Sequence, residues 1–386
     1  MRSLGVRTDF DDLSLDALRA RRSAKWATYP DDVLPAWVAE MDFALAQPVR
    51  EVLQAAVAAD DCGYPHPVGL GAAFAGFARP RYGWEVAPDA VMLLPDVMVG
   101  VTEVLRAVTE PGDGVVVNPP VYAPFFSAIR EIGREVVEAP LVAGADRFEL
   151  DLDALEAAFA GGARAYLLCN PHNPTGRVFS RAELRQIGEL SERYGVAVVA
   201  DEIHAPLTLA GAAHTPFASL GEDVGARAVT ITSASKAWNL AGLKCAVLVP
   251  GSAAMTATLR RLPESLRYHA GHLGVLGTIA AFEAGVGWLD ELVDYLDGNR
   301  RLLRELLAVH LPDVGYLMPE AGYLAWLDCR ALPLGDNPAA AFLERGRVAL
   351  SPGPNFGGQG RGFARLNFGT SAALVAEAVE RMAATP

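Results

Sequence analysis

Residues 165–201 read AYLLCNPHNPTGRVFSRAELRQIGELSERYGVAVVAD, and this stretch decides the fold class. Its two apolar ends, Ala165–Cys169 and Val196–Ala200, have the length and aliphatic content of buried strands. Between them Ser180-Arg-Ala-Glu183 is a capping box, which opens a helix that we expect to end at Gly195. A strand, a helix and a second strand in succession predict two parallel strands joined by a helical crossover.

The same alternation extends in both directions along the chain. Short aliphatic and β-branched runs that are typical of buried strands recur at Val91–Leu94, Val115–Val117, Val229–Thr232 and Ala246–Val249. Parallel strands with crossover helices are covered on both faces. The sequence therefore predicts an α/β fold, with a mainly parallel sheet of a seven-stranded type flanked by helices.

The C-terminal part of the chain has a different pattern. A long amphipathic stretch, Trp288–His310, leads into a strand-like run at Tyr323–Leu327 and a terminal helix after Thr370. These elements predict a second, smaller α+β domain. We expect a large domain over residues 45–281 and a small domain built from residues 1–44 and 282–386.

The composition is that of a globular protein. Hydrophobic residues make up 51% of the 386 residues and charged residues 20%. The formal net charge of −13 repels nucleic-acid phosphates, so we expect no nucleic-acid partner. No apolar run approaches the ~18–20 residues of a membrane helix, so no membrane association is expected. Met1–Asp12 lacks the apolar core of a secretion signal.

Cysteine placement indicates the compartment. The four cysteines, Cys62, Cys169, Cys245 and Cys329, are far apart and form no CxxC pair. This spacing favours neither a disulfide framework nor a zinc site. We therefore expect no metal and a reducing, cytoplasmic location.

Three polar clusters follow directly after predicted strands: Asn170–Gly176, Asp201–His204 and Ser233–Lys236. In an open α/β sheet, ligands bind outside the carboxyl ends of the strands. Because all three clusters occupy that position, we expect them to meet at one ligand site.

Lys236 is the candidate for covalent chemistry, although an ordinary surface lysine is the alternative. A lysine desolvated at a ligand-facing turn has a lowered pKa and can form a Schiff base with a carbonyl. The cofactor that fits is pyridoxal 5′-phosphate (PLP), which stabilises a carbanion at the Cα of an amino acid. Asp201, at a strand end, is the candidate partner of the protonated ring nitrogen, and a helix N-cap is its alternative role.

A phosphate group needs its own binding site. Asp96-Val-Met98 follows a predicted strand and opens a helix that runs through Val104. Backbone N–H groups at such a helix start, here those of Val97 and Met98, bind anions without any special side chain. Two hydroxyls and a positive charge are expected to complete the site, from Ser233, Ser235 and Lys244.

Four motifs occur in a fixed order: Asn170-Pro-His-Asn-Pro-Thr-Gly176, the strand-end Asp201, Ser233-Ala-Ser-Lys236 followed by Lys244, and Arg365-Leu-Asn-Phe-Gly369. In order and spacing they resemble the fold-type-I PLP-dependent aminotransferase superfamily over nearly the whole chain. Three further segments resemble its cystathionine β-lyase, or cysteine-S-conjugate β-lyase, branch: Trp37–Phe43, Gly63-Tyr-Pro65 and Asp201-Glu-Ile-His204.

The resemblance implies a role for each matching residue. Tyr122 should stack on the pyridine ring as part of the catalytic set, and Asn173 should hydrogen-bond the ring 3′-oxygen close to the substrate. Arg365 should hold the substrate α-carboxylate in a bidentate pair, with Ala39 of the Trp37–Phe43 segment beside the substrate.

Two more roles concern the rim of the site. His204 stands where many relatives have a ring-contacting tyrosine, so it either touches the cofactor or packs beneath it. Tyr64 should reach the phosphate of a partner subunit, because the superfamily places its sites at a homodimer interface. Taken locally, other readings remain open. Tyr122 could be a half-buried strand aromatic, Asn173 a turn residue and Arg365 a surface ion pair.

Two departures from the superfamily pattern bear on function. Lys244 stands where an arginine is usual, which keeps the charge but loses the bidentate fork. Ala321-Gly-Tyr323 stands where Gly-Thr-Tyr is frequent, which leaves substrate choice open.

The chemistry up to the Cα carbanion is common to two reactions. Loss of a thiolate from Cβ makes the chain a lyase that acts on a small-molecule amino acid, and reprotonation of the cofactor makes it an aminotransferase. We expect the lyase. A non-catalytic PLP-binding regulator is the third alternative, but no helix-turn-helix segment or basic patch precedes residue 45.

Overall fold

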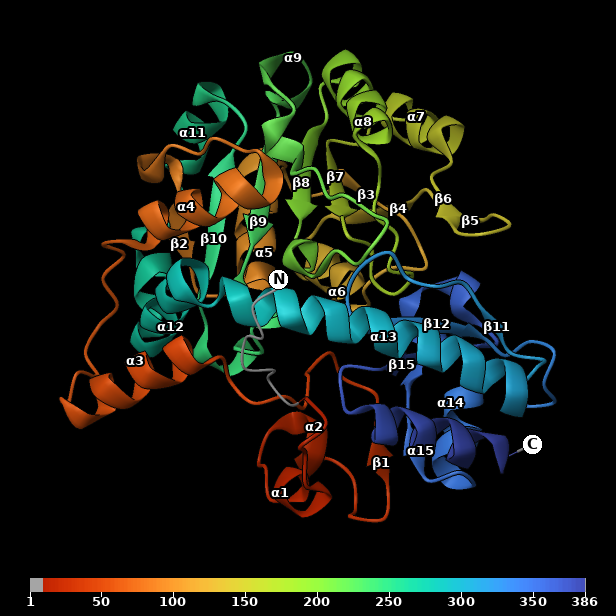
Figure 1. Ribbon diagram of the computed structural model, residues 1–386. Helices are drawn as coiled ribbons and strands as arrows, with labels where there is room; N and C mark the ends of the chain where they lie inside the picture. The colour runs from red at the N-terminus through yellow and green to blue at the C-terminus, as the bar shows by residue number, and fades with distance from the viewer. Residues whose placement is uncertain (1–9, 386) are drawn as a thin grey trace, which may run out of the picture.

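The computed structural model describes residues 10–385 and is built around one large sheet with helices on both faces (Figure 1). Within these residues the sheet has seven strands in the order β2-β10-β9-β8-β7-β3-β4. Their bounds are Met92–Leu94 (β2), Gly114–Val117 (β3), Glu135–Glu138 (β4), Ala165–Cys169 (β7), Ala197–Asp201 (β8), Ala228–Thr232 (β9) and Ala246–Pro250 (β10). All of the pairs among β4, β3, β7, β8 and β9 are parallel, whereas β10 is antiparallel to both neighbours. The predicted α/β class is confirmed.

The strand runs read from the sequence agree with the observed strands to within one residue at each end. The strand of the large sheet that sequence patterning missed is β4. Its outer residues, Glu135 and Glu138, are exposed, and only Val136 and Val137 between them are half-buried. Charged residues on an edge strand block pairing with other chains, and here they also hide the short apolar core of the strand.

Alternate residues of the sheet point to opposite faces and meet different helices. Val116, Tyr166 and Val198 pack against α7 (Leu152–Ala160) and α8 (Arg181–Tyr194). Their neighbours Val115, Leu167 and Val199 pack against α5 (Val97–Val108), α6 (Pro124–Glu131) and α11 (Ala253–Leu259) on the other face. This two-sided burial explains why the strands are apolar throughout rather than alternating.

Helix α8 has the predicted ends. The Ser180 hydroxyl accepts from the Glu183 N–H, and the Glu183 carboxylate accepts from the Ser180 N–H over 2.7 Å. Gly195 ends the helix in the left-handed conformation, at φ +69°. The crossover between β7 and β8 is therefore confirmed at both caps.

A second sheet lies beside α13 (Val286–His310), as Figure 1 shows. It has the order β11-β12-β15-β14, with bounds Gly315–Tyr316, Leu324–Asp328, Phe363–Asn367 and Ser351–Pro352. Its pairs are all antiparallel. Two further helices accompany this sheet, α14 (Pro338–Glu344) and α15 (Ala372–Ala383). The long helix expected over Trp288–His310 and the strand expected at Tyr323–Leu327 are present.

The N-terminal segment joins this second group of elements. Strand β1 (Leu34–Pro35) pairs in parallel with β13 (Val348–Ala349). The short helices α1 (Leu15–Arg19) and α2 (Ala24–Ala27) precede it. The expected domain limits at residues 45 and 281 stay a prediction. Residues 1–9, which that prediction assigns to the small domain, lie outside the described residues.

The remaining elements lie around the large sheet. Helices α3 (Gln47–Ala58) and α4 (Leu70–Tyr82) both pack against α12 (His272–Ala284). The minor elements are α9 (Glu222–Gly225), α10 (Ala234–Ala237), β5 (Val142–Ala143) and β6 (Phe148–Glu149). No single helix within residues 10–385 is long and apolar enough to cross a membrane; α12 and α13 pass that test of length and composition only together, as a pair bent by 80°.

Candidate active site

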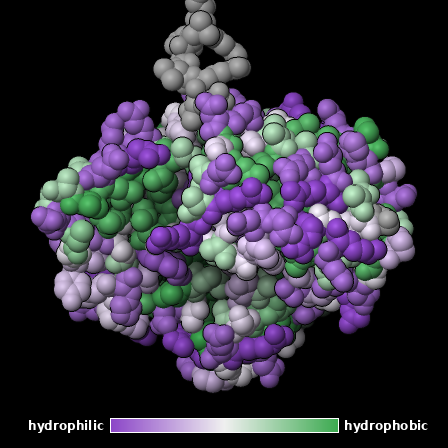
Figure 2. All heavy atoms as spheres, turned by 90° about the horizontal axis from the view of Figure 1, so that it is seen from below, coloured by the Kyte–Doolittle hydropathy of each residue, from purple (hydrophilic) through white to green (hydrophobic). Residues whose placement is uncertain are grey.

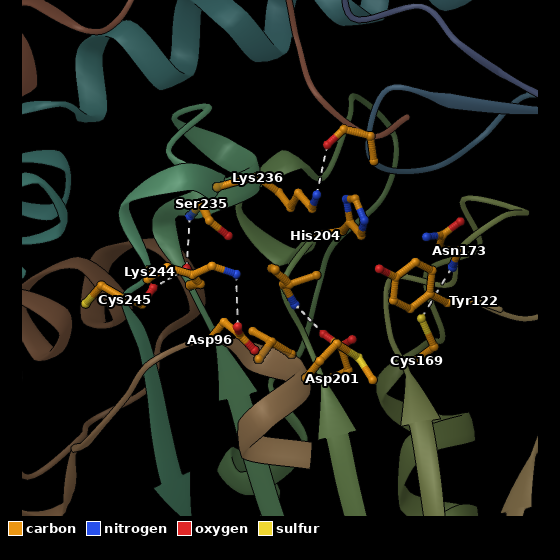
Figure 3. A pocket seen from close by; sticks show the side chains of 16 residues that line it. Asp96, Tyr122, Cys169, Asn173, Asp201, His204, Ser235, Lys236, Lys244 and Cys245 are labelled. Carbon is orange, nitrogen blue, oxygen red and sulfur yellow. Dashed lines mark hydrogen bonds and ion pairs between the residues drawn. The ribbon is translucent and has the colours of Figure 1, made fainter. Parts of the chain in front are cut away.

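A pocket of about 270 Å³ lies at the carboxyl ends of β7, β8 and β9 (Figure 3). Most of the residues expected at the site line it: Ala39, Val97, Met98, Tyr122, Asn173, Asp201, His204, Ser233, Ser235, Lys236 and Lys244. The chain segments that carry them are separated by up to 205 positions, from Ala39 to Lys244. The fold therefore brings the three polar clusters together, as the strand-end argument predicts.

Lys236 is held by the start of α10. The Ser233 hydroxyl caps this helix by accepting from the Ser235 N–H over 3.0 Å, and it donates to the Cys245 carbonyl over 2.6 Å. The Lys236 Nζ donates to the Ala39 carbonyl over 2.8 Å. Burial, followed by the nearby Arg365 charge, lowers the pKa of Lys236 to about 8. The unprotonated, nucleophilic form of this amine is thus a minority near neutral pH, but a far larger one than in an ordinary lysine.

Asp201 is the last residue of β8 and is only 4% exposed. Its Oδ1 accepts from the Ile203 N–H over 3.1 Å, and no ion pair reaches it from any residue in 10–385. Burial raises the pKa of this carboxyl to about 7. The residue that caps the following short helix is His204, so Asp201 is not the N-cap that was its alternative role. A buried carboxyl without a cation is suited to a protonated heterocycle in the pocket.

The opposite end of the pocket contains the start of α5. Its N-cap is Asp96, whose Oδ1 accepts from the Val99 N–H over 2.8 Å. The first N–H groups of an α-helix, here those of Val97 and Met98, have no partner inside the helix and attract anions. Lys244 Nζ lies 3.1 Å from Asp96 Oδ2. The sequence predicted Lys244 at this end of the pocket but not its pairing with the Asp96 side chain.

Arg365 on β15 is 5% exposed. Its guanidinium donates to Asn173 Oδ1 over 3.0 Å, to the Trp37 carbonyl over 2.9 Å and to Ser351 Oγ over 3.0 Å. No carboxylate pairs with it in the part of the chain that the structure describes, and its Nε has no partner there. Burial lowers its pKa to about 10. Arg365 is therefore not a surface ion pair but a buried cation able to receive an anion.

Aromatic and imidazole rings form the walls beside these charges. Burial raises the pKa of the Tyr122 phenol, so this ring is neutral. His204 lies 6.0 Å from the Tyr323 ring between centroids. Burial, with the charges of Lys236 and Arg365, lowers the pKa of His204 to about 3. Its imidazole is therefore an uncharged donor or acceptor, not an acid, at the pH of the cell.

The segment Trp37–Asp42 is held against the site by its own backbone. Each of its carbonyl oxygens accepts a hydrogen bond from a side chain. The Trp37 carbonyl accepts from Arg365 and Ser351, that of Val38 from Asn367, and that of Ala39 from Lys236 and Tyr323. The Glu40 carbonyl accepts from Lys25 and Asn367, that of Met41 from Asn239, and that of Asp42 from Arg21. Sequence reasoning could not find this set, because it spans most of the chain.

A buried ion pair holds the far end of this segment. Lys25 Nζ lies 2.7 Å from Asp42 Oδ2, and the Trp26 indole donates to Asp42 Oδ1 over 2.7 Å. Lys25 is 1% exposed. Both carboxylate oxygens of Asp42 are thereby occupied away from the pocket, so Asp42 belongs to the support of the site rather than to its lining.

Five lining residues were not among the expected site residues: Asp96, Cys169, Ile203, Ala241 and Cys245. Burial raises the pKa of the Cys169 thiol, and raises that of Cys245 to about 11. Both thiols are therefore protonated and weak nucleophiles at neutral pH. Within the described ranges no group of three or more His, Cys, Asp or Glu side chains could hold a metal ion.

Tyr64 does not line the pocket of its own chain. Its side chain is 83% exposed, and its ring lies 6.2 Å from that of Tyr268. Other apolar residues are exposed nearby in sequence, at Val57 and Val68. Figure 2 shows hydrophobic residues gathered on the flank of the molecule where α3 lies.

The donor set of the pocket fits PLP. A buried carboxyl is available to a protonated ring nitrogen, a buried amine to an aldehyde, and a helix start to a phosphate. Figure 3 shows Asp201, Lys236 and Tyr122 directed toward the same space, with Lys244 and Asp96 at its other end.

Comparison with known proteins places these features in a family. The model of the aminotransferase class I and II family matches residues 28–382. A protein of Mycobacterium leprae (strain TN), provisionally named cystathionine beta-lyase, is 46% identical, with 96% of each chain covered. Cystathionine beta-lyase PatB of Bacillus subtilis (strain 168) is 38% identical over 92% of each chain. The crystal structure of a provisionally named PLP-dependent β-cystathionase from Corynebacterium diphtheriae matches with a TM-score of 0.92 and 36% identity, over 97% of this chain and 98% of that one.

Proposed function

This chain belongs to the aminotransferase class I and II family, and we propose that it is a PLP-dependent carbon–sulfur β-lyase. It cleaves cystathionine or related cysteine S-conjugates to pyruvate, ammonia and a thiol. One observation carries the PLP chemistry: a buried amine and a buried carboxyl without a cation line one pocket, and a buried guanidinium without an anion is bonded to Asn173 of that lining. The names of relatives that match nearly the full length support the lyase branch.

Each charged residue takes one task. When bound, PLP supplies an electron sink for negative charge at the substrate Cα. Lys236 holds the cofactor and then removes the Cα proton, since its lowered pKa leaves it basic but not permanently charged. Asp201 keeps the ring nitrogen protonated, and Arg365 holds the substrate α-carboxylate.

The other lining residues position the cofactor. Tyr122 and Asn173 line the pocket, where they would cover the ring face and hydrogen-bond the ring 3′-oxygen. The N–H groups of Val97 and Met98 receive the phosphate together with Ser233, Ser235 and Lys244. His204 would contact the ring as a neutral imidazole, and Ala39 would border the substrate.

Elimination and transamination diverge after proton removal. In elimination the electron pair left at Cα expels the Cβ thiolate, and water then releases pyruvate and ammonia from the remaining three-carbon unit. A transaminase for dicarboxylic acids needs a second cation for the distal carboxylate. Lys244, the other lysine that lines the pocket, pairs with Asp96 and is assigned to the phosphate rather than to a distal carboxylate, so a dicarboxylate transaminase is disfavoured.

The test is steady turnover without a keto acid. We expect the purified, PLP-loaded protein to form pyruvate, ammonia and thiol from L-cystathionine continuously over many turnovers. The Lys236→Ala variant is the control for reaction catalysed by free PLP. Turnover that stops after one cofactor equivalent and resumes only on addition of a keto acid would assign the chain to the aminotransferases.

We also propose that the enzyme is a cytoplasmic homodimer with shared sites. The apolar flank supports the dimer: Leu273, Leu276 and Ile279 of α12 remain partly exposed beside α3. Tyr64 on this chain then reaches the phosphate end of the partner's pocket. The four free cysteines, of which Cys62 is exposed, support a reducing compartment.

A further inference from the structure

Glu202, the residue after Asp201, has all of its polar groups engaged. It is 2% exposed. Its carboxylate accepts from the Phe217 N–H over 2.7 Å and from the Thr230 hydroxyl over 3.3 Å, and the His214 Nε2 lies 3.1 Å from its Oε2. Its own N–H donates to the Ile231 carbonyl over 2.8 Å. A buried carboxylate with this many donors is an anchor point for the backbone around it.

The Glu202 carbonyl extends this anchoring to the next residues. It accepts from the Thr232 hydroxyl over 3.1 Å and from the Ala205 N–H over 2.9 Å. The turn that begins at Asp201 and contains His204 is therefore fixed mainly through Glu202. Within the described residues, the Asp201 side chain accepts one hydrogen bond, from the Ile203 N–H.

His214 supports Glu202 from the side away from the cofactor pocket. It lines a separate open pocket of about 550 Å³, together with Arg81 and Asp290, and its ring lies 5.5 Å from that of Tyr82. The Arg81 charge is taken up by Asp290 and by the Pro206 carbonyl. Of these side chains, His214 is the one within hydrogen-bonding distance of Glu202.

Neighbouring residues at the end of a strand point to opposite sides. Asp201 lines the cofactor pocket, whereas the Glu202 carboxylate meets His214, Phe217 and Thr230 behind it. The negative charge of Glu202 acts on Asp201 in the same direction as burial and raises the pKa of the Asp201 carboxyl. Lys236 acts on Asp201 from the pocket side in the opposite direction.

We infer that Glu202, held by His214, is a positioning residue for Asp201: it fixes the turn that brings Asp201 and His204 into the pocket and places a negative charge behind the Asp201 carboxylate. This inference rests on the proposed role of Asp201 as the partner of the ring nitrogen. It adds a pair of residues that touch neither cofactor nor substrate but set the strength of cofactor binding.

The test compares Glu202→Gln with Asp297→Asn, a buried carboxylate paired with Arg300 and Arg301 on α13. The first readout uses PLP-free protein: the titration of Asp201 is followed by ¹³C NMR of labelled aspartate and assigned by its loss in Asp201→Asn. We expect the midpoint of Asp201 to fall in Glu202→Gln, because a neighbouring negative charge is removed, and to stay unchanged in Asp297→Asn.

The second readout is the dissociation constant of PLP. We expect Glu202→Gln to raise it at least about 10-fold more than Asp297→Asn does, and to add little in the Asp201→Asn background, since residues that act as a unit are not additive. If Glu202→Gln does not fold, His214→Phe replaces it, and His214→Gln, which retains an N–H donor, should restore part of the affinity.

The outcomes separate the two proposals. If Asp201→Asn leaves PLP binding unchanged, the proposed role of Asp201 fails. If Asp201→Asn weakens binding while Glu202→Gln changes neither the Asp201 midpoint nor PLP affinity beyond the Asp297→Asn control, Glu202 has a structural role only and the inference is overturned.

Discussion

The Lys236 amine and the Ala39 carbonyl, which are 197 positions apart in the chain, are joined by a hydrogen bond of 2.8 Å. The same carbonyl accepts from the Tyr323 hydroxyl over 3.0 Å. Lys236 is thus bonded to a main-chain atom of the segment whose Trp37 carbonyl also accepts from Arg365. The segment Trp37–Asp42 therefore holds both Lys236, which we propose acts on the Cα proton, and Arg365, which we propose binds the substrate carboxylate.

Lys236 should be the lysine that holds the cofactor. After borohydride reduction of the PLP-loaded protein, peptide mapping should find the pyridoxyl group on Lys236. Lys236→Ala should lose at least about 10²–10⁴-fold in kcat, the usual contribution of a positioned proton-transfer group. The Lys244→Met variant serves as the control and should still be labelled at Lys236. A label on Lys244 or Lys25 in the unaltered protein would contradict the assignment.

The buried Asp201 carboxyl should make PLP-free protein less stable as the pH rises. Its pKa is about 7 in the folded state and 3.8 in a model peptide, so the folded state binds the proton more tightly. Stability conferred by that proton is present below about pH 4 and is lost as pH rises through about 7. Asp201→Asn removes this dependence and should be the more stable protein at about pH 8, by at most on the order of 4 kcal/mol.

Urea unfolding of both PLP-free proteins at about pH 4 and about pH 8 measures this difference. The advantage of Asp201→Asn should shrink toward zero at the lower pH, where both folded proteins carry a neutral side chain. An advantage of the same size at both pH values would mean that Asp201 is not held protonated by burial.

Arg365→Leu should act on substrate binding and on Lys236 at once. Loss of the carboxylate partner should lower kcat/KM by about 10²-fold, in the range of a charge-assisted hydrogen-bond pair. Because Arg365 lowers the pKa of Lys236, its removal should raise that pKa above about 8. The pH dependence of Lys236 acetylation in PLP-free protein, followed by mass spectrometry, measures the second effect.

Arg330→Leu is the matched control for this change. Like Arg365, the Arg330 guanidinium lies 4.9 Å from a phenylalanine ring, but it is paired with Asp328 at the surface. It should change neither kcat/KM nor the reactivity of Lys236. Equal effects of the two substitutions would mean that Arg365 does not belong to the substrate site.

The Lys25–Asp42 pair should be essential to stability. Lys25→Met leaves the Asp42 carboxylate buried without its cation, which typically costs about 3–5 kcal/mol. The exposed pair Arg79–Glu85, whose side chains are 72% and 74% exposed, is the comparison. Arg79→Met should cost less than about 1 kcal/mol. Denaturant unfolding measures the loss in the free energy of unfolding for each variant. Similar losses would mean that the Asp42 carboxylate does not depend on Lys25 as a buried partner.

Tyr64 should complete the site of a second copy of the chain. Inactive Tyr64→Ala and Lys236→Ala proteins, mixed under conditions that exchange subunits, should regain part of the activity, because one of the two hybrid sites has both residues. Sedimentation should give a dimer. A fully active monomer, or mixtures that stay inactive although hybrids form, would argue against a shared site.

Sequence alone was sufficient for the large sheet except its edge strand β4, and for the polar clusters at its carboxyl ends. Buried parallel strands are apolar throughout, and crossover helices carry capping signals such as Ser180 and Gly195, so both are local patterns. Once those strands are placed, the rule that ligands bind at their carboxyl ends brings Asp201 and Lys236 together without coordinates. Family resemblance then supplied Arg365, which no local pattern marks as a ligand residue.

Tertiary structure alone decided how these groups are supported and charged. The pairing of Lys25 with Asp42, of Asp96 with Lys244 and of Glu202 with His214 joins residues whose side chains meet only after the chain has folded. The pKa changes of Asp201 and Lys236 likewise follow from burial, which is a property of the packed molecule. Local sequence determines which groups are present, whereas solvent exclusion and long-range contacts determine their proton affinity and their partners.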